Sequence, residues 1–376
     1  MGLANAGTLT PGLTDAYSRA ADPELLPVLI TLADSASASR MAEQLATEGL
    51  PLAQIHQRVM DSLTSQAAAR PAELLRLLET MTTNGTARAV RPFWITNVIA
   101  AELTRSAAET LVEQTGIEEI GLDETVTLQR NQPLLSDGGA QSLSAIGALD
   151  VWLKGTRGDG CIVCVIGDGL ASTHPALKNN WRGKTAPASE CWYDKNGGPP
   201  ASCGSESSYL LGLLCGAPAG NNPATGVAPA ANWIAANIFC AGTARLSDVL
   251  AAYQWAADPD GNSATVNDVP DAILSPWQVN SDCLGAEPSH VWQFVANLEA
   301  LGPLPVFAAS SLQAPASLPQ CFTIGNLDIR GGQSMPEASA PQGPSPCDPR
   351  ITKPDLSAPG AAVHTTGETG YVDVTG

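Results

Sequence analysis

The sequence of 376 residues has few basic and histidine residues. Its 19 lysines and arginines stand against 37 aspartates and glutamates, which gives a net charge of −18. A surface of this sign repels phosphate groups, so nucleic acid and anionic membranes are poor partners. There are only four histidines, and none is closely paired with a cysteine. A zinc site is therefore not expected.

The sequence also lacks long apolar segments and a recognisable export signal. No stretch reaches the roughly 18 apolar residues that a membrane-spanning helix requires. The N-terminus, Met1-Gly-Leu-Ala-Asn-Ala6, has neither the basic region nor the long apolar region of a signal peptide. Either export does not use an ordinary signal peptide, or the signal has been removed from this sequence.

The nine cysteines are an odd number, so at least one is unpaired within the chain. Cys161 and Cys164 lie three apart on one predicted strand and should face opposite sides, which argues against a shared metal ion. Loop-closing disulfides could join Cys191 to Cys203 and Cys321 to Cys347. Free buried thiols explain these four cysteines equally well.

The first third of the chain alternates between strand and helix patterns. Residues 1–24 are expected to form a loosely ordered lead-in, and the following residues, 25–128, a small domain. Its predicted strands cover residues 26–34, 90–101 and 117–128, and its predicted helices cover residues 37–49, 59–83 and 106–115. This order predicts a ferredoxin-like α+β sandwich. A polar, glycine-containing linker, residues 129–148, follows.

From residue 149 to residue 376, apolar strands again alternate with helices. The predicted strands cover residues 161–166, 231–239, 272–274, 305–309 and 321–325, and the predicted helices cover residues 208–215, 246–257 and 291–301. Strands that are apolar nearly throughout are typical of a parallel sheet with helices on both faces.

The central stretch of this second domain runs from Cys161 to Leu177. Six apolar residues are followed by Gly-Asp-Gly, which predicts a buried strand that enters a tight loop. In open α/β sheets, the loops at the carboxyl ends of strands usually hold the chemistry. Three further motifs are His174-Pro-Ala-Leu177 at the end of this stretch, Gly226-Val-Ala-Pro229, and Lys353-Pro-Asp-Leu-Ser-Ala-Pro-Gly360.

These segments resemble the subtilisin-like serine proteases, most closely the bacillopeptidase F branch. The resemblance implies a subtilisin-like α/β fold for residues 149–376. It further implies that residues 25–128 are an inhibitory propeptide, docked on the helices of the second domain. An active member of the family would cut itself within residues 129–148.

Peptide hydrolysis on this fold requires a serine nucleophile, a histidine base, an aspartate that orients it and an oxyanion donor. The resemblance places Gly167 in the aspartate position, with Asp168 one residue later, and Glu206 in the histidine position. It places Ser311 at the oxyanion asparagine. The nucleophile would follow Gly376, where this sequence stops. No catalytic residue is therefore intact.

The replacements are poorly suited to catalysis. A shift of one residue is expected to point Asp168 away from the aspartate position. A lone Glu206 with an ordinary pKa near 4 would be a weak base. The sedolisins are related serine peptidases that use a glutamate as the base. They have aspartates at the two positions where this chain has Leu210 and Ser311. We expect Asp168 and Glu206 to be loop or helix-cap acids, and His174 and His364 to be structural.

The substrate groove implied by the resemblance is also altered, to Ser275-Pro276-Trp277-Gln278. Pro276 cannot donate an N–H to a ladder, and Gln278 places a side chain where the family has glycine.

We therefore hypothesise a catalytically inactive subtilase-like module that binds a peptide or protein partner. In the family, the helix that begins at the nucleophile packs in the middle of the domain. Without that helix an apolar trench would be open, and a partner or a chain segment beyond Gly376 would cover it. An active or conditionally active peptidase, with its serine beyond residue 376, is the first alternative; a structural or assembly component is the second. Family members often bind calcium on surface loops, but the sequence assigns no calcium site, no other metal and no cofactor. The family suggests an extracellular or exported protein.

Overall fold

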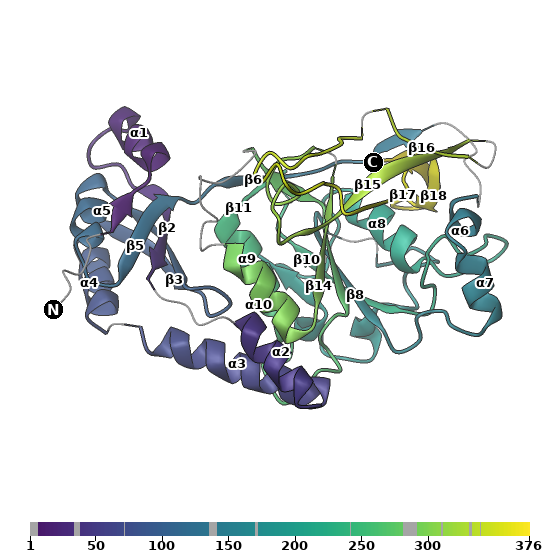
Figure 1. The fold of residues 1–376 in the computed structure, drawn as a ribbon, viewed down its shortest axis with the longest axis horizontal. Coiled ribbons are helices and arrows are strands. Elements are labelled where there is room, and N and C mark those ends of the chain that lie inside the picture. The colour runs from purple at the N-terminus through teal and green to yellow at the C-terminus, as the bar shows by residue number, and fades with distance from the viewer. Residues whose placement is uncertain are drawn as a thin grey trace.

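The computed structural model describes residues 7–33, 38–70, 72–134, 141–169, 172–240, 242–280, 292–309, 311–330, 333–338 and 340–376. A small sheet and a larger sheet lie side by side, with helices α9 and α10 between them (Figure 1). Within the described residues, no helix combines the length and the apolar character needed to cross a membrane.

The small sheet has the strand order β1-β5-β2-β4-β3. The last four of these strands pair antiparallel, in the arrangement of a ferredoxin-like sandwich. One face of the sheet is covered by helices α1, α4 and α5, whose apolar residues share one core with the strands. The bounds are β1 Thr8–Leu9, β2 Leu26–Leu32, β3 Ala87–Pro92, β4 Val98–Leu103, β5 Ile117–Leu122, α1 Pro11–Arg19, α4 Ala72–Thr83 and α5 Arg105–Val112.

Two details of this half differ from the sequence-based expectation. The expected loose lead-in contains β1, which pairs with β5, and α1, which buries Leu13 and Tyr17 in the small core. The two side chains lie four residues apart and so share one face of the helix, and the Tyr17 hydroxyl donates to the Leu103 carbonyl at 2.8 Å. The single helix predicted for residues 59–83 is two helices, α3 (Leu52–Ala68) and α4. Pro71 falls between them in the sequence, and proline lacks the N–H that a continuous helix requires.

The large sheet has the order β16-β15-β14-β12-β8-β10-β9, and β17 also pairs with β15. All of these pairs are parallel except β15 with β16. This is the subtilisin-like α/β fold that the sequence predicts. The bounds are β8 Ile162–Gly167, β9 Trp192–Asp194, β10 Asn232–Asn237, β12 Ala272–Ser275, β14 Leu304–Ala308, β15 Phe322–Arg330, β16 Gln333–Pro336 and β17 Leu356–Pro359.

Central strand β8 is buried on both faces. Ile162, Cys164 and Ile166 join the core formed with helices α9 (Leu246–Ala257) and α10 (Gln293–Leu301). Val163 and Val165 join a second core with helix α8 (Glu206–Cys215). Cys161 packs against this second core, so Cys161 and Cys164 do face opposite sides.

The N-terminal half packs on the large domain through helices α2 (Ala38–Thr47) and α3. Leu45 and Val59 belong to the same core as Leu298 of α10. His56 Nδ1 lies 2.8 Å from the Leu301 carbonyl oxygen. Apolar packing is therefore continuous between the two halves of the chain.

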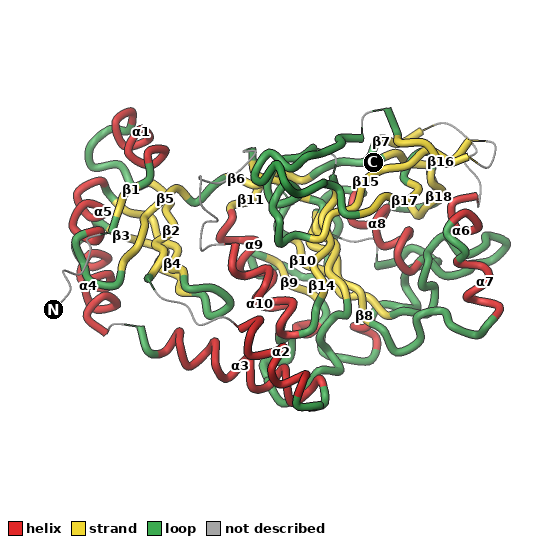
Figure 2. The backbone as a smooth tube through the Cα atoms, viewed as in Figure 1, coloured by secondary structure: helices red, strands yellow, loops and turns green. Residues whose placement is uncertain are grey.

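Two smaller sheets join distant segments of the chain (Figure 2). One has the order β11-β6-β13 and the other β18-β19-β7. The linker predicted at residues 129–148 contributes β7, and it also contains a short helix, α6. The bounds are β6 Thr125–Leu128, β7 Gln132–Leu134, β11 Thr243–Arg245, β13 Trp277–Val279, β18 Val363–Thr366, β19 Tyr371–Thr375, α6 Gln141–Ala145 and α7 Ala148–Leu153.

Neither of the two possible disulfide pairings forms, and the alternative of free buried thiols is confirmed for Cys191 and Cys321. Cys203 is bonded to Cys240, with their Cα atoms 5.1 Å apart, whereas Cys191 and Cys321 are free buried thiols. The loop that precedes α8 lies beside the segment that follows β10, and this proximity is not visible in the sequence spacing.

Candidate functional site: a closed groove

Three of the four predicted degenerate positions, Gly167, Asp168 and Glu206, lie where β8 ends and α8 begins. At Gly167 a Cβ atom would lie 2.2 Å from the Ser207 hydroxyl oxygen. The position of the family aspartate therefore has no room for a side chain while Ser207 keeps its place.

Asp168 is buried, with 1 % of its surface exposed, and caps the first turn of α8. Its Oδ1 accepts hydrogen bonds from Ser207 N at 3.0 Å and from the Ser207 hydroxyl at 3.2 Å. Its side chain therefore faces the first turn of α8, which begins at Glu206, in the helix-cap role predicted from the sequence. Arg130 Nη1 lies 3.7 Å from the other carboxylate oxygen.

Glu206 opens α8 and is 2 % exposed. It accepts hydrogen bonds from the backbone N–H of Asn131, at 3.0 Å, and from the Asn131 side-chain amide. Burial, together with the charge of Asp168, raises the pKa of Glu206 to about 7. The ordinary pKa assumed from the sequence is therefore wrong. The main cause is that the Glu206 carboxylate is buried away from water, which cannot be read from the sequence.

Ser311, the residue predicted at the oxyanion position, takes part in a further polar contact. Its hydroxyl donates to Gln278 Oε1 at 2.6 Å, and Gln129 Nε2 donates to the same oxygen at 2.9 Å. The side chain that replaces the family glycine thus links Ser311 to the linker.

Strand β6 lies along the residues of the predicted groove. It lies between β11 and β13 and pairs antiparallel with both, with Thr127 opposite Gln278. Pro276 supplies its carbonyl oxygen instead of an N–H, and accepts from Gln129 N at 2.7 Å. The residues of the predicted groove therefore still pair with a strand, although Pro276 lacks an N–H.

The other two groove residues are turned into the domain. The Ser275 hydroxyl contacts the Tyr253 hydroxyl. Trp277 is 1 % exposed and stacks on Trp292, with ring centroids 6.3 Å apart. Of these four residues, Pro276 and Gln278 are the ones that accept hydrogen bonds from Gln129.

The chain continues from β6 across the degenerate positions to β7, which pairs with β19 so that Gln132 lies opposite Thr375. We call residues 125–134 the closing segment. Three consecutive side chains of this segment each face one altered position. Gln129 reaches Ser311 through Gln278, Arg130 lies beside Asp168, and Asn131 binds Glu206.

Asp123 ties down the chain just before the closing segment. Its carboxylate accepts from Ser247 N at 2.9 Å and from the Ser247 hydroxyl at 2.6 Å, which places an anion at the N-terminus of α9. Burial raises the pKa of Asp123 to about 6. The sequence alone does not point to Asp123, because an aspartate between two strands carries no signal for a helix that begins more than a hundred positions later.

The two singled-out histidines support a hairpin. His174 Nε2 lies 3.0 Å from the Gly370 carbonyl oxygen, and the ring packs edge-on against Tyr371. His364 Nδ1 lies 2.7 Å from Asp373 Oδ1, and the two residues face each other across β18 and β19. This histidine–carboxylate pair therefore joins the two strands of the hairpin.

Comparison with known proteins accords with this geometry. Residues 158–376 match the model of the subtilase family. The chain is 27 % identical to Bacillopeptidase F of Bacillus subtilis over 343 residues, which cover 82 % of this chain and 23 % of that protein.

Fervidolysin from Fervidobacterium pennivorans, a keratinolytic enzyme related to subtilisin, has a similar structure. The TM-score is 0.63 at 15 % identity, over 95 % of this chain and 53 % of that one. At this identity, the likeness concerns the fold alone. The chain thus spans about a quarter of one relative and about half of the other.

Proposed function

This chain belongs to the subtilase family of serine peptidases, and we propose that it is a closed, non-hydrolytic member that acts by binding an extended peptide or a protein segment. The proposal rests chiefly on one observation. Asp168 and Glu206, near and at the predicted catalytic positions, contact Arg130 and Asn131 of the closing segment, and the preceding Gln129 binds the groove residue Gln278.

The contacts are chemically matched. Glu206 and Asp168 are buried acids, and the closing segment offers them an amide, a backbone N–H and a guanidinium. The two hydrogen bonds from Asn131 contribute about 1.5–3 kcal/mol each while Glu206 is ionised, whereas the 3.7 Å ion pair of the exposed Arg130 contributes less. These residues are therefore suited to holding a segment in place, and the histidine that would take a proton from a hydroxyl is absent from its position.

The ligand would enter as a strand. β11 and β13 pair with β6 through the backbone, so they can pair with any extended chain that displaces it. The Cys203–Cys240 disulfide favours an oxidising compartment, in keeping with export. A structural or assembly role would use the same fold without opening the groove.

A labelled peptide with the sequence of residues 125–134 tests the proposal. The closing segment competes with it at an effective concentration on the order of millimolar. The triple variant Gln129→Ala, Arg130→Ala, Asn131→Ala should therefore bind the peptide at least about tenfold more tightly than the wild type, because each lost contact weakens closure. A control variant, Arg88→Ala, changes an exposed ion pair with Glu102 on the small sheet and should leave peptide binding unchanged. Equal binding by all three proteins would refute the proposal.

A second candidate is a conditionally active peptidase in which Glu206 acts as the base. The observation in its favour is the raised pKa of Glu206, about 7, which suits proton transfer at neutral pH. Labelling of the full-length protein by a fluorophosphonate, together with a mass that reveals a cut within residues 129–148, would establish this candidate. An unlabelled, uncut chain would support the closed binding module.

A further inference from the structure

One oxygen of the Asp168 carboxylate has no hydrogen bond in the closed groove. The Oδ1 atom accepts both bonds from Ser207, whereas Oδ2 is buried and has no hydrogen-bond partner among the residues that the structure describes. Arg130 Nη1 lies 3.7 Å from Oδ2, which is too far for a hydrogen bond. Buried carboxylate oxygens are normally hydrogen-bonded, so Oδ2 is an acceptor that a closer donor would satisfy.

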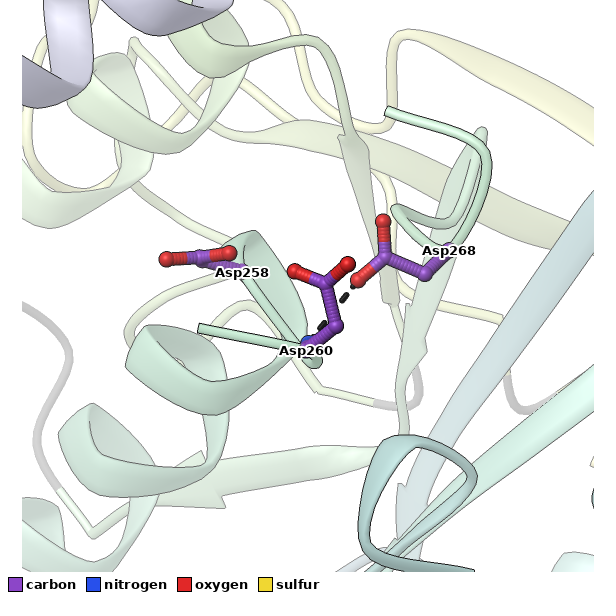
Figure 3. Close-up of side chains that lie close together, drawn as sticks. All are labelled: Asp258, Asp260 and Asp268. Atoms are coloured by element: carbon purple, nitrogen blue, oxygen red, sulfur yellow. Dashed lines mark hydrogen bonds between the residues drawn. The ribbon is translucent and has the colours of Figure 1, made fainter. Parts of the chain in front are cut away.

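Buried aspartate oxygens of this kind occur at two other described residues, Asp258 and Asp268. These two residues lie in the loop between α9 and β12, on either side of Asp260 (Figure 3). Asp168 differs from them because a side chain of the closing segment, the guanidinium of Arg130, lies beside its unpaired oxygen. The chain itself therefore shows which chemical group approaches Asp168.

We propose that Asp168 forms an arginine subsite of the groove. An extended peptide that displaces the closing segment would place an arginine where Arg130 now lies, and that guanidinium would donate to Asp168 Oδ2. The inference rests on the binding function proposed above. It adds the chemistry of the ligand, which carries a basic side chain at one defined position.

The fixed backbone of the closing segment explains why Arg130 itself does not reach Oδ2. Strand β6 ends just before this residue and β7 begins just after it, and their pairing with β13 and β19 holds the backbone on both sides. A free peptide is not joined to the small domain, so it can shift by the roughly 1 Å that separates this contact from a charge-assisted hydrogen bond. A ligand arginine is therefore expected to bind Asp168 more closely than Arg130 does.

The loop before α8 holds the Asp168 carboxylate in place. The Cys203 N–H donates to the Asp168 carbonyl oxygen at 3.0 Å, and Cys203 is bonded to Cys240. At Gly204 a Cβ atom would lie 2.2 Å from Asp168 Oδ2, so the loop packs directly against this oxygen. A carboxylate that is held by Ser207 and by this loop loses little freedom when a ligand binds, which favours binding.

The surroundings of the subsite favour arginine over lysine. Glu206 is a second buried acid at this end of the groove; burial and the charge of Asp168 raise its pKa, whereas Arg130 lowers it. A cation at the position of Arg130 is therefore stabilised by both acids. A guanidinium is more weakly hydrated than an ammonium group, so it loses less when it leaves water for this site.

Binding of four labelled peptides, measured by fluorescence anisotropy, tests the subsite. The receptor is the full chain with the triple change Gln129→Ala, Arg130→Ala, Asn131→Ala, which removes Arg130 from the subsite. The parent peptide has the sequence of residues 125–134, the second carries Arg130→Lys and the third carries Arg130→Gln. The fourth, exchanged peptide combines Arg130→Gln with Gln132→Arg and keeps the composition and charge of the parent. It is the control for general attraction, because a chain of net charge −18 attracts any cationic peptide.

The parent peptide should bind at least about tenfold more tightly than the Arg130→Gln peptide, because a hydrogen bond between charged groups is lost. The Arg130→Lys peptide should fall between them, and the exchanged peptide should bind as weakly as the Arg130→Gln peptide. With Asp168→Asn added to the receptor, the parent and Arg130→Gln peptides should bind equally, since the amide keeps an acceptor for Ser207 but not the charge. Asp61→Asn, which alters an exposed residue of α3, should leave the ranking unchanged.

Equal binding of the parent and the exchanged peptide would overturn the subsite, and so would a ranking that survives Asp168→Asn. The peptide comparison leaves Asp168 unaltered, so it decides the question by itself if the Asp168→Asn protein does not fold. Equal binding of all four peptides would overturn the subsite and leave the proposed function standing, whereas no binding by any of them would refute both.

Discussion

Replacement of Glu206 by glutamine isolates the energetics of the closed groove. The carboxylate is 2 % exposed, and its pKa is raised from 4.5 to about 7. Each pKa unit corresponds to about 1.36 kcal/mol, so the ionised form costs up to about 3 kcal/mol in the folded state at pH 8.

The sign follows from proton binding. Between pH 4.5 and pH 7, the folded chain retains a proton on Glu206 that the unfolded chain has released. The free energy of unfolding of the wild type therefore falls as the pH rises through this window. Glu206→Gln carries no titrating group, so it should lack this part of the slope and be more stable than the wild type at pH 8 by up to about 3 kcal/mol. At pH 4 the two proteins should be nearly equal.

Guanidinium denaturation, followed by tryptophan fluorescence at pH 4, 6 and 8, measures these differences. Glu48→Gln, which alters an exposed glutamate of the small domain, serves as the control and should follow the wild type at every pH. A Glu206→Gln protein that is less stable than the wild type at pH 8, or that retains the full slope between pH 4.5 and 7, would refute the reasoning.

Three further predictions concern the groove and its supports. Because the pKa of the buried Asp123 is raised, the free energy of unfolding of the wild type should fall by up to about 3 kcal/mol between pH 3.8 and about 6. Asp123→Asn should not show this fall in the same denaturation series. Trp277→Ala should cost about 3–5 kcal/mol, since the ring is buried against Trp292 and Phe307; a loss below about 1 kcal/mol would contradict this packing. Gly167→Ala should lower the unfolding free energy by about 1–3 kcal/mol through its clash with Ser207, and Ser207→Gly in the same chain should recover part of the loss.

Much of the fold could be predicted from the sequence, because its signals are local. The apolar run at residues 161–166 predicts a buried central strand, and its alternate side chains do enter two different cores. The boundaries of the helices follow less directly from the pattern of apolar residues. Pro71 interrupts a helix pattern, and the apolar spacing of Leu13 and Tyr17 forms α1 in the expected lead-in.

The amino-acid sequence is sufficient to say which residues stand at the altered positions, namely Gly167, Glu206 and Ser311. What these residues contact is set by the tertiary structure. Asn131 meets Glu206 across 75 positions of the chain, and Gln129 meets Gln278 across 149. Burial of the Glu206 carboxylate, and with it the pKa of about 7, depends on the segments packed around it. Such contacts depend on the order of strands in the sheets and on the path of the linker, and local patterns of residue type carry no information about either.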